Sequence, residues 1–194
     1  MTYIAKSFDK KVVELLKGGA VGFMPSDTIY GLSCRALAEK AVAKIYELKG
    51  RSYTKPLIVL ISNLRMLDSL GIRYNKVIKS KYWPGPLTII LAAPKAPSWL
   101  TRGSGQLAIR WSAYQELNEL INKVGPLVST SANPEGGQPA ESVEQAQKYF
   151  GELLDFYIEA GKLKARPSTI AELKNDKLKI LRQGELLVKK EDMA

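Results

Sequence analysis

Two polar blocks of the sequence follow predicted strands and carry side chains that could bind a small ligand. The first, residues 25–32 (PSDTIYGL), combines a proline, two hydroxyls, a carboxylate and a phenol in one predicted turn. Such a turn can present its hydroxyl groups to a substrate. The alternative is structural: Pro25 and Asp27 end the strand, and a serine or threonine caps the next helix.

The second block, residues 129–133 (STSAN), places three hydroxyls and a carboxamide at the end of a predicted strand, before the loop PEGG at 134–137. Hydroxyls and backbone N–H groups at a strand terminus form an uncharged cradle for an anion. Helix capping or an Asx-turn would account for one or two of these side chains, but less readily for all four. The block therefore favours a ligand contact.

Three cations, Lys49, Arg51 and Lys55, lie within seven residues, and no acidic residue occurs between Gly50 and Met66. Clustered cations beside the edge of a buried strand suit phosphate groups. The competing interpretation is a solvated surface, since runs of charge usually face water.

Arg110 lies inside the apolar run LAIRW at residues 107–111. A cation within a strand is costly to bury unless it pairs with an acid or reaches an anionic ligand. The sequence leaves a structural salt bridge and a ligand contact equally open. Ser168, Thr169 and Arg182 repeat the combination of hydroxyl and cation more weakly.

The elements that must position these residues alternate between short apolar runs and helical patterns, which is typical of an α/β domain. The pattern predicts helices over residues 9–17 (with Ser7 as N-cap), 39–49 (closed by Gly50), 64–70, 74–82, 114–124 and 143–150. It predicts strands over residues 20–24, 56–61, 87–92, 107–111, 127–130, 156–159, 169–173 and 178–181. Residues 99–105 and 133–140 are predicted connections.

Composition limits the classes of function. The chain has 194 residues, of which 45% are apolar and 25% charged, so we expect one packed domain over residues 1–194. It contains no histidine, which excludes a Ser-His-Asp triad, a Cys-His dyad and zinc sites that need imidazole. Cys34, the single cysteine, is interpreted as a small buried residue, and it favours a reducing, cytoplasmic location.

The net charge of +10 favours a polyanionic partner, namely a nucleic acid, a nucleotide or an acidic lipid. The longest apolar run, residues 87–93, is too short to span a membrane, so no membrane contact is expected. Neither of the standard phosphate-binding patterns, GxxxxGKS/T and GxGxxG, is present.

Seven blocks together resemble the YrdC-like family of threonylcarbamoyl-AMP synthases. They are PSDTIYGL (25–32), KGRSYTKPL (49–57), YWPGPLT (82–88), LAIR (107–110), PLVSTSAN (126–133), PST (167–169) and LRQG (181–184). They follow the family's order and cover nearly the whole chain. The resemblance implies a single YrdC-like domain, with a twisted, mostly mixed sheet flanked by helices around a large, positively charged cavity.

The resemblance also implies a nucleotidyltransferase. It would convert L-threonine, bicarbonate and ATP into threonylcarbamoyl-AMP and pyrophosphate, for threonylcarbamoyladenosine modification of tRNA. The implied partners are these substrates, tRNA or another RNA, and a downstream tRNA threonylcarbamoyl transferase. The implied cofactor is a magnesium ion held mainly by the ATP phosphates, with no dedicated metal ligand in the protein.

The resemblance assigns roles to the candidate residues. The implied contacts to L-threonine are Thr28, Arg110, Ser129 and Ser168, with Thr169 as an alternative to Ser168. The implied contacts to the nucleotide are Arg51, Lys55, Ser131, Asn133 and Arg182, and the implied catalytic pair is Lys49 and Arg51. The implied chemistry accumulates anions, so it requires positive charge and positioning rather than an imidazole base.

The sequence departs from the family at three places. Leu60 stands where some members carry histidine, Gln106 stands where they carry serine or threonine, and the loop after Asn133 reads PEGG where SG is frequent.

Two other classes of function remain open. A basic module that binds structured RNA without catalysis explains the charge, but not the compact polar blocks. A carbamoyl-adenylate-forming domain that uses carbamoyl phosphate would keep the fold and change the substrate.

Overall fold

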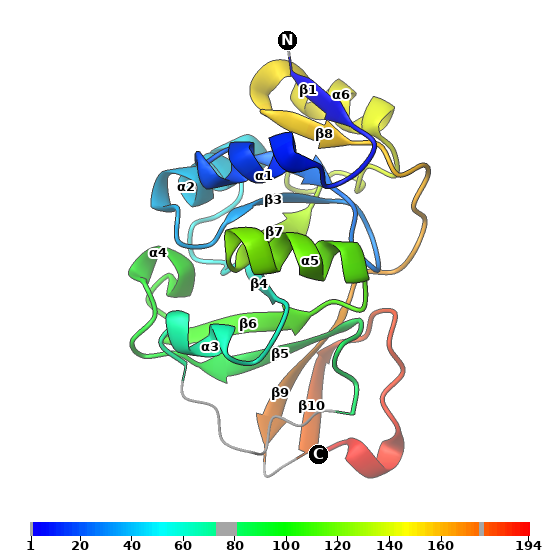
Figure 1. Cartoon of the computed structure of the whole chain (residues 1–194). Helices are drawn as coiled ribbons and strands as arrows, with labels where there is room; N and C mark the ends of the chain where they lie inside the picture. Colours follow the sequence, from blue (N-terminus) through cyan, green and yellow to red (C-terminus); the bar gives the residue numbers. More distant parts are fainter. Residues whose placement is uncertain (1, 73–80, 175–176) are drawn as a thin grey trace.

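The computed structural model describes residues 2–72, 81–174 and 177–194. Within them, ten strands form one mixed sheet in the order β1-β8-β2-β3-β7-β4-β6-β5-β9-β10. Figure 1 shows this sheet running the length of the molecule, with the N-terminus beside β1 and the C-terminus beside β10. The strands are β1 Tyr3–Ala5, β2 Gly22–Met24, β3 Gly31–Arg35, β4 Ile58–Ile61, β5 Leu87–Ala92, β6 Gln106–Trp111, β7 Leu127–Ser131, β8 Phe156–Ile158, β9 Thr169–Lys174 and β10 Lys177–Arg182.

Helices cover both faces of the sheet. They are α1 Lys10–Lys17, α2 Glu39–Lys49, α3 Met66–Ser69, α4 Ser98–Thr101, α5 Gln115–Val124 and α6 Val143–Phe150, with 3-10 turns at η2 Gly151–Leu153 and η3 Lys190–Asp192. The expected α/β class, a mixed sheet flanked by helices, is therefore confirmed.

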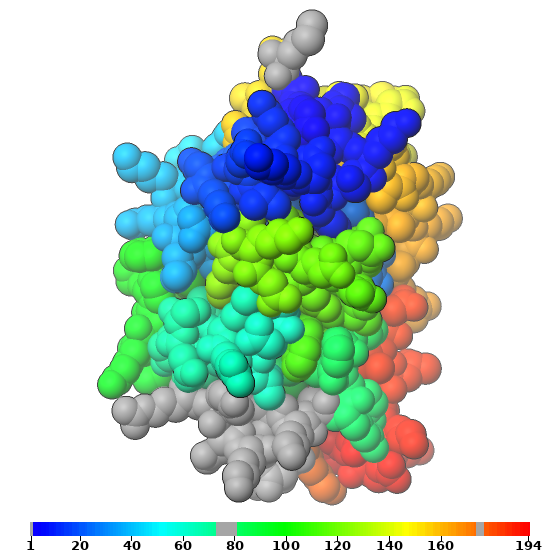
Figure 2. Space-filling model, in the orientation of Figure 1, coloured from blue at the N-terminus to red at the C-terminus, as the bar shows by residue number. Residues whose placement is uncertain are grey.

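Two hydrophobic cores lie on opposite faces of the sheet because strand side chains alternate. In β8, Phe156 packs with Leu16 of α1 and Leu120 of α5, whereas its neighbour Tyr157 packs in the core that contains Ile45 of α2. Figure 1 shows α1 and α5 side by side on one face. In the space-filling view their side chains cover the upper and middle parts of that face (Figure 2).

The ends of the first two long helices follow from local chemistry. Asp9, rather than the predicted Ser7, is the N-cap of α1, because its side chain accepts a hydrogen bond from the N–H of Val12 at 2.9 Å. The prediction of Ser7 was therefore wrong. Gly50 ends α2 as predicted, with a φ of 60°, a left-handed conformation that glycine adopts without steric cost.

Strand β3 is the main element that the sequence did not predict. Residues 25–32 were expected to form one turn, but the turn ends at Tyr30 and Gly31 begins a strand between β2 and β7. Its sequence GLSCR is poor in strand-forming residues, so pairing on both sides, with Leu32 and Cys34 fully buried, determines its conformation. The predicted burial of Cys34 is confirmed, and burial raises the pKa of its thiol.

The other differences are small. Strand β1 was not predicted, and α4 lies where residues 99–105 were expected to be a connection. The helix expected over 64–70 is shorter, since α3 spans Met66–Ser69. The helix expected over 74–82 falls almost entirely on residues 73–80, outside the described residues. No helix in the described ranges is long and apolar enough to cross a membrane.

Candidate functional site

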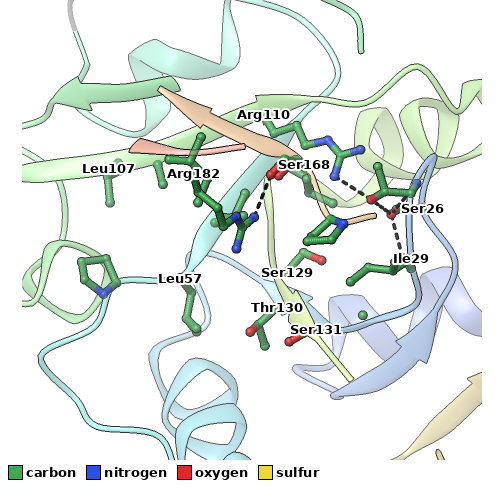
Figure 3. Close-up of a pocket in the computed structure, with 18 of the residues that line it drawn as sticks. Ser26, Ile29, Leu57, Leu107, Arg110, Ser129, Thr130, Ser131, Ser168 and Arg182 are labelled. Carbon is green, nitrogen blue, oxygen red and sulfur yellow. Dashed lines mark hydrogen bonds between the residues drawn. The ribbon is translucent and has the colours of Figure 1, made fainter. Parts of the chain in front are cut away.

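A cavity of about 470 Å³ lies against the sheet, within the range of roughly 300–1,000 Å³ that is usual for small-molecule sites. Figure 3 shows Arg110 and Arg182 extending into this region from one side, with Ser129, Thr130 and Ser131 of β7 on the other.

The strand register builds the floor of the cavity. Ser129 of β7 pairs with Ile58 of β4, and Ile58 pairs with Ala108 of β6. Two residues further along, Leu60 pairs with Arg110. Because side chains alternate along each strand, all five lie on the same face of the sheet, and all five line the cavity.

A glycine brings β3 close to this floor. A Cβ atom on Gly31 would lie 2.8 Å from the Ser129 Oγ and 2.9 Å from the Thr130 carbonyl oxygen, closer than real Cβ contacts allow. Glycine at this position therefore lets the Ser129 hydroxyl lie directly against the β3 backbone, next to the 25–30 turn.

The 25–30 turn is closed by its own hydroxyls. Ser26 Oγ donates to the Ile29 carbonyl at 2.8 Å and lies 3.2 Å from Thr28 Oγ1. Thr28 Oγ1 also accepts a hydrogen bond from Arg110 Nη1 at 3.0 Å, as the dashed line in Figure 3 marks. Ser26 and Thr28 both line the cavity, so hydroxyls that close the turn also face the cavity. A strand, β3, follows the turn, so neither hydroxyl caps a helix there.

Arg110 forms a buried ion pair with Asp27. Its Nη2 lies 2.5 Å from Asp27 Oδ1, and the two side chains are only 6% and 10% exposed. Burial by itself raises the pKa of the Asp27 carboxyl. The charge of Arg110, with hydrogen bonds from the Ser112 hydroxyl and the Ala113 N–H, outweighs it and brings the pKa below its ordinary value.

Arg110 thus forms the salt bridge that one interpretation predicted, and it also lines the cavity, the position that a ligand contact requires. In the part of the chain that the structure describes, its buried Nε has no hydrogen-bond partner. Arg110 therefore meets the cavity only through the small part of its side chain that is exposed, 6%.

Arg182 lies at the end of β10, the edge strand of the sheet, and lines the cavity. The register of β10 against β9 shifts immediately before it, a bulge that redirects its side chain. Its Nη2 donates to the Ser168 carbonyl at 2.8 Å, and the Ser168 hydroxyl lies 2.8 Å from the Thr88 hydroxyl. Burial, followed by the charges of Arg110 and Arg51, lowers the pKa of Arg182, so the three guanidinium groups share one electrostatic environment.

Lys49 lies outside the cavity lining. Its buried ammonium group donates to the carbonyl oxygens of Ser131 and Asn133, both at 2.5 Å, and so ties the end of α2 to the end of β7. Burial, together with the charge of Arg51, lowers the pKa of Lys49 to about 8, although Glu135 acts in the opposite direction.

Of the remaining predicted nucleotide contacts, one lines the cavity and two do not. Arg51 lines the cavity, whereas Lys55 is paired with Glu135 through a 2.6 Å contact between Nζ and Oε1. Asn133 is buried, and its Nδ2 donates to two carbonyl oxygens of its own loop at 2.7 and 2.9 Å, which fixes the shape of the 134–137 loop.

The structure thus brings most of the predicted site residues together around one cavity. Those that line it are Thr28, Arg51, Arg110, Ser129, Ser131, Ser168 and Arg182. Lys49, Lys55 and Asn133 are not part of its lining but support the adjacent loops. The positions that depart from the family pattern, Leu60 and Gln106, also line it.

Sequence reasoning missed the two acids that pair with the site cations. Asp27 lies 83 residues from Arg110, and Glu135 lies 80 residues from Lys55. Each acid occurs within a polar block that the sequence singles out, but nothing in the sequence indicates its partner. Ser104 and Thr130 were likewise not assigned a role, and they line the cavity.

Metal-binding groups are scarce in the described part of the chain. No cluster of three or more acidic or cysteine side chains able to hold a metal ion occurs among the described residues. None of the described acidic residues lines the cavity.

The fold and the cavity together define a class of protein. It is an α/β protein whose mixed sheet forms one wall of a pocket with three arginines and several hydroxyls. Such a pocket is suited to a small ligand with more than one anionic group.

Comparison with known proteins identifies the family. The sequence model of the Sua5/YciO/YrdC family, described as "Telomere recombination", matches residues 14–184. A putative threonylcarbamoyl-AMP synthase of Methanocaldococcus jannaschii is 34% identical over 189 residues, which cover 93% of this chain and 89% of the relative. A threonylcarbamoyl-AMP synthase of Halorhodospira halophila is 37% identical over 148 residues, which cover 73% and 76%.

Among solved structures, the crystal structure of P. abyssi Sua5 complexed with L-threonine superposes with a TM-score of 0.84 at 27% sequence identity. The match covers 95% of this chain and 57% of the Sua5 chain. The chain therefore belongs to the Sua5/YciO/YrdC family, which confirms the resemblance found in its sequence.

Proposed function

We propose that this protein is a threonylcarbamoyl-AMP synthase, a nucleotidyltransferase that makes threonylcarbamoyl-AMP and pyrophosphate from L-threonine, bicarbonate and ATP. The observation that carries the proposal is the cavity, in which Arg51, Arg110 and Arg182 surround one space together with the hydroxyls of β7. Relatives that bear this activity in their names, at 34% and 37% identity, support it.

Arg110 is the proposed contact for the threonine carboxylate. Its Nη atoms donate to Thr28 and Asp27, which fixes the orientation of the guanidinium beside the cavity that it lines. The hydroxyls of Thr28, Ser129 and Ser168 would hold the rest of the amino acid. An arginine fixed in this way loses little conformational entropy when the ligand binds.

Arg51 and Arg182, with Ser131, are the proposed contacts for the nucleotide inside the cavity. Lys55 would contribute from the rim. We assign Lys49 and Asn133 a supporting role, because each donates to backbone carbonyls at the end of β7 or in the loop that follows it.

The proposed reaction proceeds in two steps. The threonine amine attacks the carbon of carbon dioxide and loses a proton, which gives a carbamate; where bicarbonate is attacked instead, a C–O bond of bicarbonate also breaks and water leaves. A carbamate oxygen then attacks the α-phosphate, the bond from that phosphorus to the β-phosphate bridging oxygen breaks, and pyrophosphate leaves. Both steps gather negative charge, so fixed guanidinium groups and oriented hydroxyls supply the electrostatic stabilisation.

Magnesium is proposed as part of the nucleotide substrate, held mainly by the phosphates. Hydroxyls and arginines, rather than carboxylates, line the cavity within the described ranges, a donor set that suits phosphate oxygens better than a dedicated metal cage. When bound there, magnesium would neutralise phosphate charge.

The proposed product is a mixed anhydride, which is chemically reactive. We therefore propose a downstream tRNA threonylcarbamoyl transferase as its consumer and the cytoplasm as its location. A direct contact with tRNA or another RNA is proposed from the net charge of +10.

The test is pyrophosphate release from ATP, with L-threonine and bicarbonate omitted in turn. We expect release only when both are present. Equal release without threonine would overturn the proposal. Release that depends on carbamoyl phosphate instead would favour the carbamoyl-adenylate alternative.

A further inference from the structure

Two loops meet at the rim of the cavity. The cation loop, residues 49–56, contributes Arg51 and Pro56 to the cavity lining. The Glu135 loop, residues 133–137, begins two residues after Ser131, which also lines the cavity. Contact between the two loops is therefore contact across the edge of the proposed nucleotide site.

Glu135 makes that contact through three hydrogen bonds. Its carboxylate accepts from Lys55 Nζ at 2.6 Å and from the Ser52 N–H at 3.3 Å, and its own N–H donates to the Lys49 carbonyl at 2.7 Å. The hydrogen bond from Lys55, the Ser52 N–H and the charge of Arg51 together lower the pKa of Glu135. The carboxylate is thus ionised and embedded in a positive environment.

The groups around this carboxylate are those that bind a phosphate. An ammonium group and a backbone N–H donate to its two oxygens, and the charge of Arg51 acts on it from nearby. The same kinds of group recognise phosphate oxygens in proteins. Glu135 therefore occupies an anion position of the cation loop. Its side chain is 38% exposed and that of Lys55 is 57% exposed, and an ion pair this exposed holds its partners weakly.

We propose that Glu135 is an internal counter-ion of the cation loop, which sets the affinity for nucleotide by competing with the phosphates of ATP for Lys55 and the Ser52 N–H. This inference rests on the proposed function, in which ATP is the substrate. A triphosphate carries more charge than one carboxylate and displaces it, so the protein binds ATP less tightly than the same site would without Glu135.

A simple positioning role gives the opposite expectation. If Glu135 served to hold Lys55 in the geometry that ATP requires, removing its charge would weaken ATP binding. The direction of the change therefore separates the two roles. Loss of an exposed ion pair alone has no reason to tighten ligand binding.

The experiment measures the dissociation constant of ATP by titration calorimetry, without threonine so that no turnover occurs. It compares the wild type with Glu135→Gln, which keeps the size and hydrogen-bonding capacity of the side chain. We expect ATP to bind Glu135→Gln about two- to fivefold more tightly, the range of an exposed ion pair. Inorganic triphosphate, which has no nucleoside, should show the same gain.

The matched control is Glu144→Gln. Glu144 pairs with Lys148 on α6 and is not part of the cavity lining. Its replacement by glutamine changes the net charge by the same amount as Glu135→Gln. Its ATP affinity should equal that of the wild type. In a Lys55→Gln background, Glu135→Gln should produce a smaller gain in ATP affinity, because the cation for which Glu135 and ATP compete is absent.

Unchanged or weaker ATP binding by Glu135→Gln would overturn this inference while leaving the proposed function intact. An equal gain in Glu144→Gln would overturn it too, since the effect would then reflect net charge alone. Absence of ATP binding by both the wild type and Glu135→Gln would overturn the proposed function together with the inference.

Discussion

At the scale of single residues, the Arg110–Asp27 pair joins stability and proposed binding in one contact. Both side chains are nearly fully buried, so each needs the other. A buried ion pair contributes little net stability compared with apolar residues, but removing one partner leaves an uncompensated charge. The pair also aims Arg110 at the cavity, and an apolar replacement could not do this.

Arg110→Ala should therefore reduce both properties. We expect a loss of about 3–5 kcal/mol in the free energy of unfolding, because Asp27 remains buried without its counter-charge, and a large rise in the threonine dissociation constant. Arg110→Lys keeps the charge but loses the planar fork, so threonine binding should weaken with a smaller loss of stability. Urea unfolding and threonine titration at saturating ATP measure the two effects.

The double variant Asp27→Asn, Arg110→Met serves as the control for this pair. It removes both charges, so it should recover much of the stability lost in Arg110→Ala and none of the threonine affinity. If the double variant recovered threonine affinity together with stability, the role of Arg110 would be purely structural.

Lys49 gives a prediction about pH. Its pKa of about 8 in the folded protein lies below its ordinary value of 10.5. Between about pH 8 and pH 10.5 the unfolded chain binds more protons at this residue than the folded protein does. The contribution of Lys49 to the free energy of unfolding therefore rises with pH. We expect the wild type to gain stability relative to Lys49→Met as the pH rises from about 7.5 to about 9.5. A difference in urea midpoint that stays constant over this range would contradict it.

At the scale of elements, β3 determines how the polar blocks meet. It lies between β2 and β7. Because Gly31 pairs with Ser131, the 25–30 turn lies beside the STSAN block, whose first three residues end β7. Its approach to β7 depends on Gly31, because a side chain there would collide with Ser129 and the Thr130 carbonyl. One hydrogen atom in place of a methyl group thus sets the spacing between two halves of the site.

Gly31→Ala should push β3 away from β7 and displace the Ser129 hydroxyl. We expect a loss of about 1–3 kcal/mol in the free energy of unfolding, typical of an overpacked interior, with weaker threonine binding. Gly18→Ala is the matched control: its φ is −75°, and the nearest atom to a new Cβ is the Leu15 carbonyl oxygen at 3.3 Å. Threonine affinity that is equal in the two variants would argue against the spacing role of Gly31.

At the scale of the whole molecule, positive charge exceeds the acidic groups that could neutralise it, both in the chain and at the cavity. The net charge is +10, and three arginines line the cavity, of which Arg110 is paired with Asp27. Positive potential concentrated in a pocket with low-dielectric walls attracts anionic substrates and raises their local concentration. Salt weakens this attraction by screening.

ATP binding should therefore depend strongly on ionic strength. We expect its dissociation constant to rise several-fold between about 50 and 300 mM potassium chloride, because the Debye length falls to a few ångströms over this range. L-Threonine, a zwitterion, should change less than about twofold under the same conditions. Equal salt dependence for the two ligands would contradict a charge-driven nucleotide site. Calorimetric titration at four salt concentrations measures both.

The sequence by itself determined the class of fold, most of the elements and seven of the polar residues that line the cavity. Helix α2 illustrates why, because its apolar spacing and the Gly50 stop are local properties that need no partner. The polar blocks were equally visible, since hydroxyls and cations that interrupt apolar runs are unusual wherever the chain folds. The absence of histidine likewise excluded whole classes of catalysis without any structure.

Only the tertiary structure decided which groups meet. Strand β3 has a sequence that does not favour a strand, and it forms because β2 and β7 satisfy its backbone from both sides. The pairing of Arg110 with Asp27 and of Lys55 with Glu135 joins residues 83 and 80 positions apart, and sequence spacing carries no information about contacts at that distance. Lys49 was predicted as a catalytic cation, and its buried ammonium donates to the carbonyls of Ser131 and Asn133, which lie more than 80 positions along the chain. Local preferences are set by neighbours in the chain, whereas charge pairing and pKa values are set by neighbours in space.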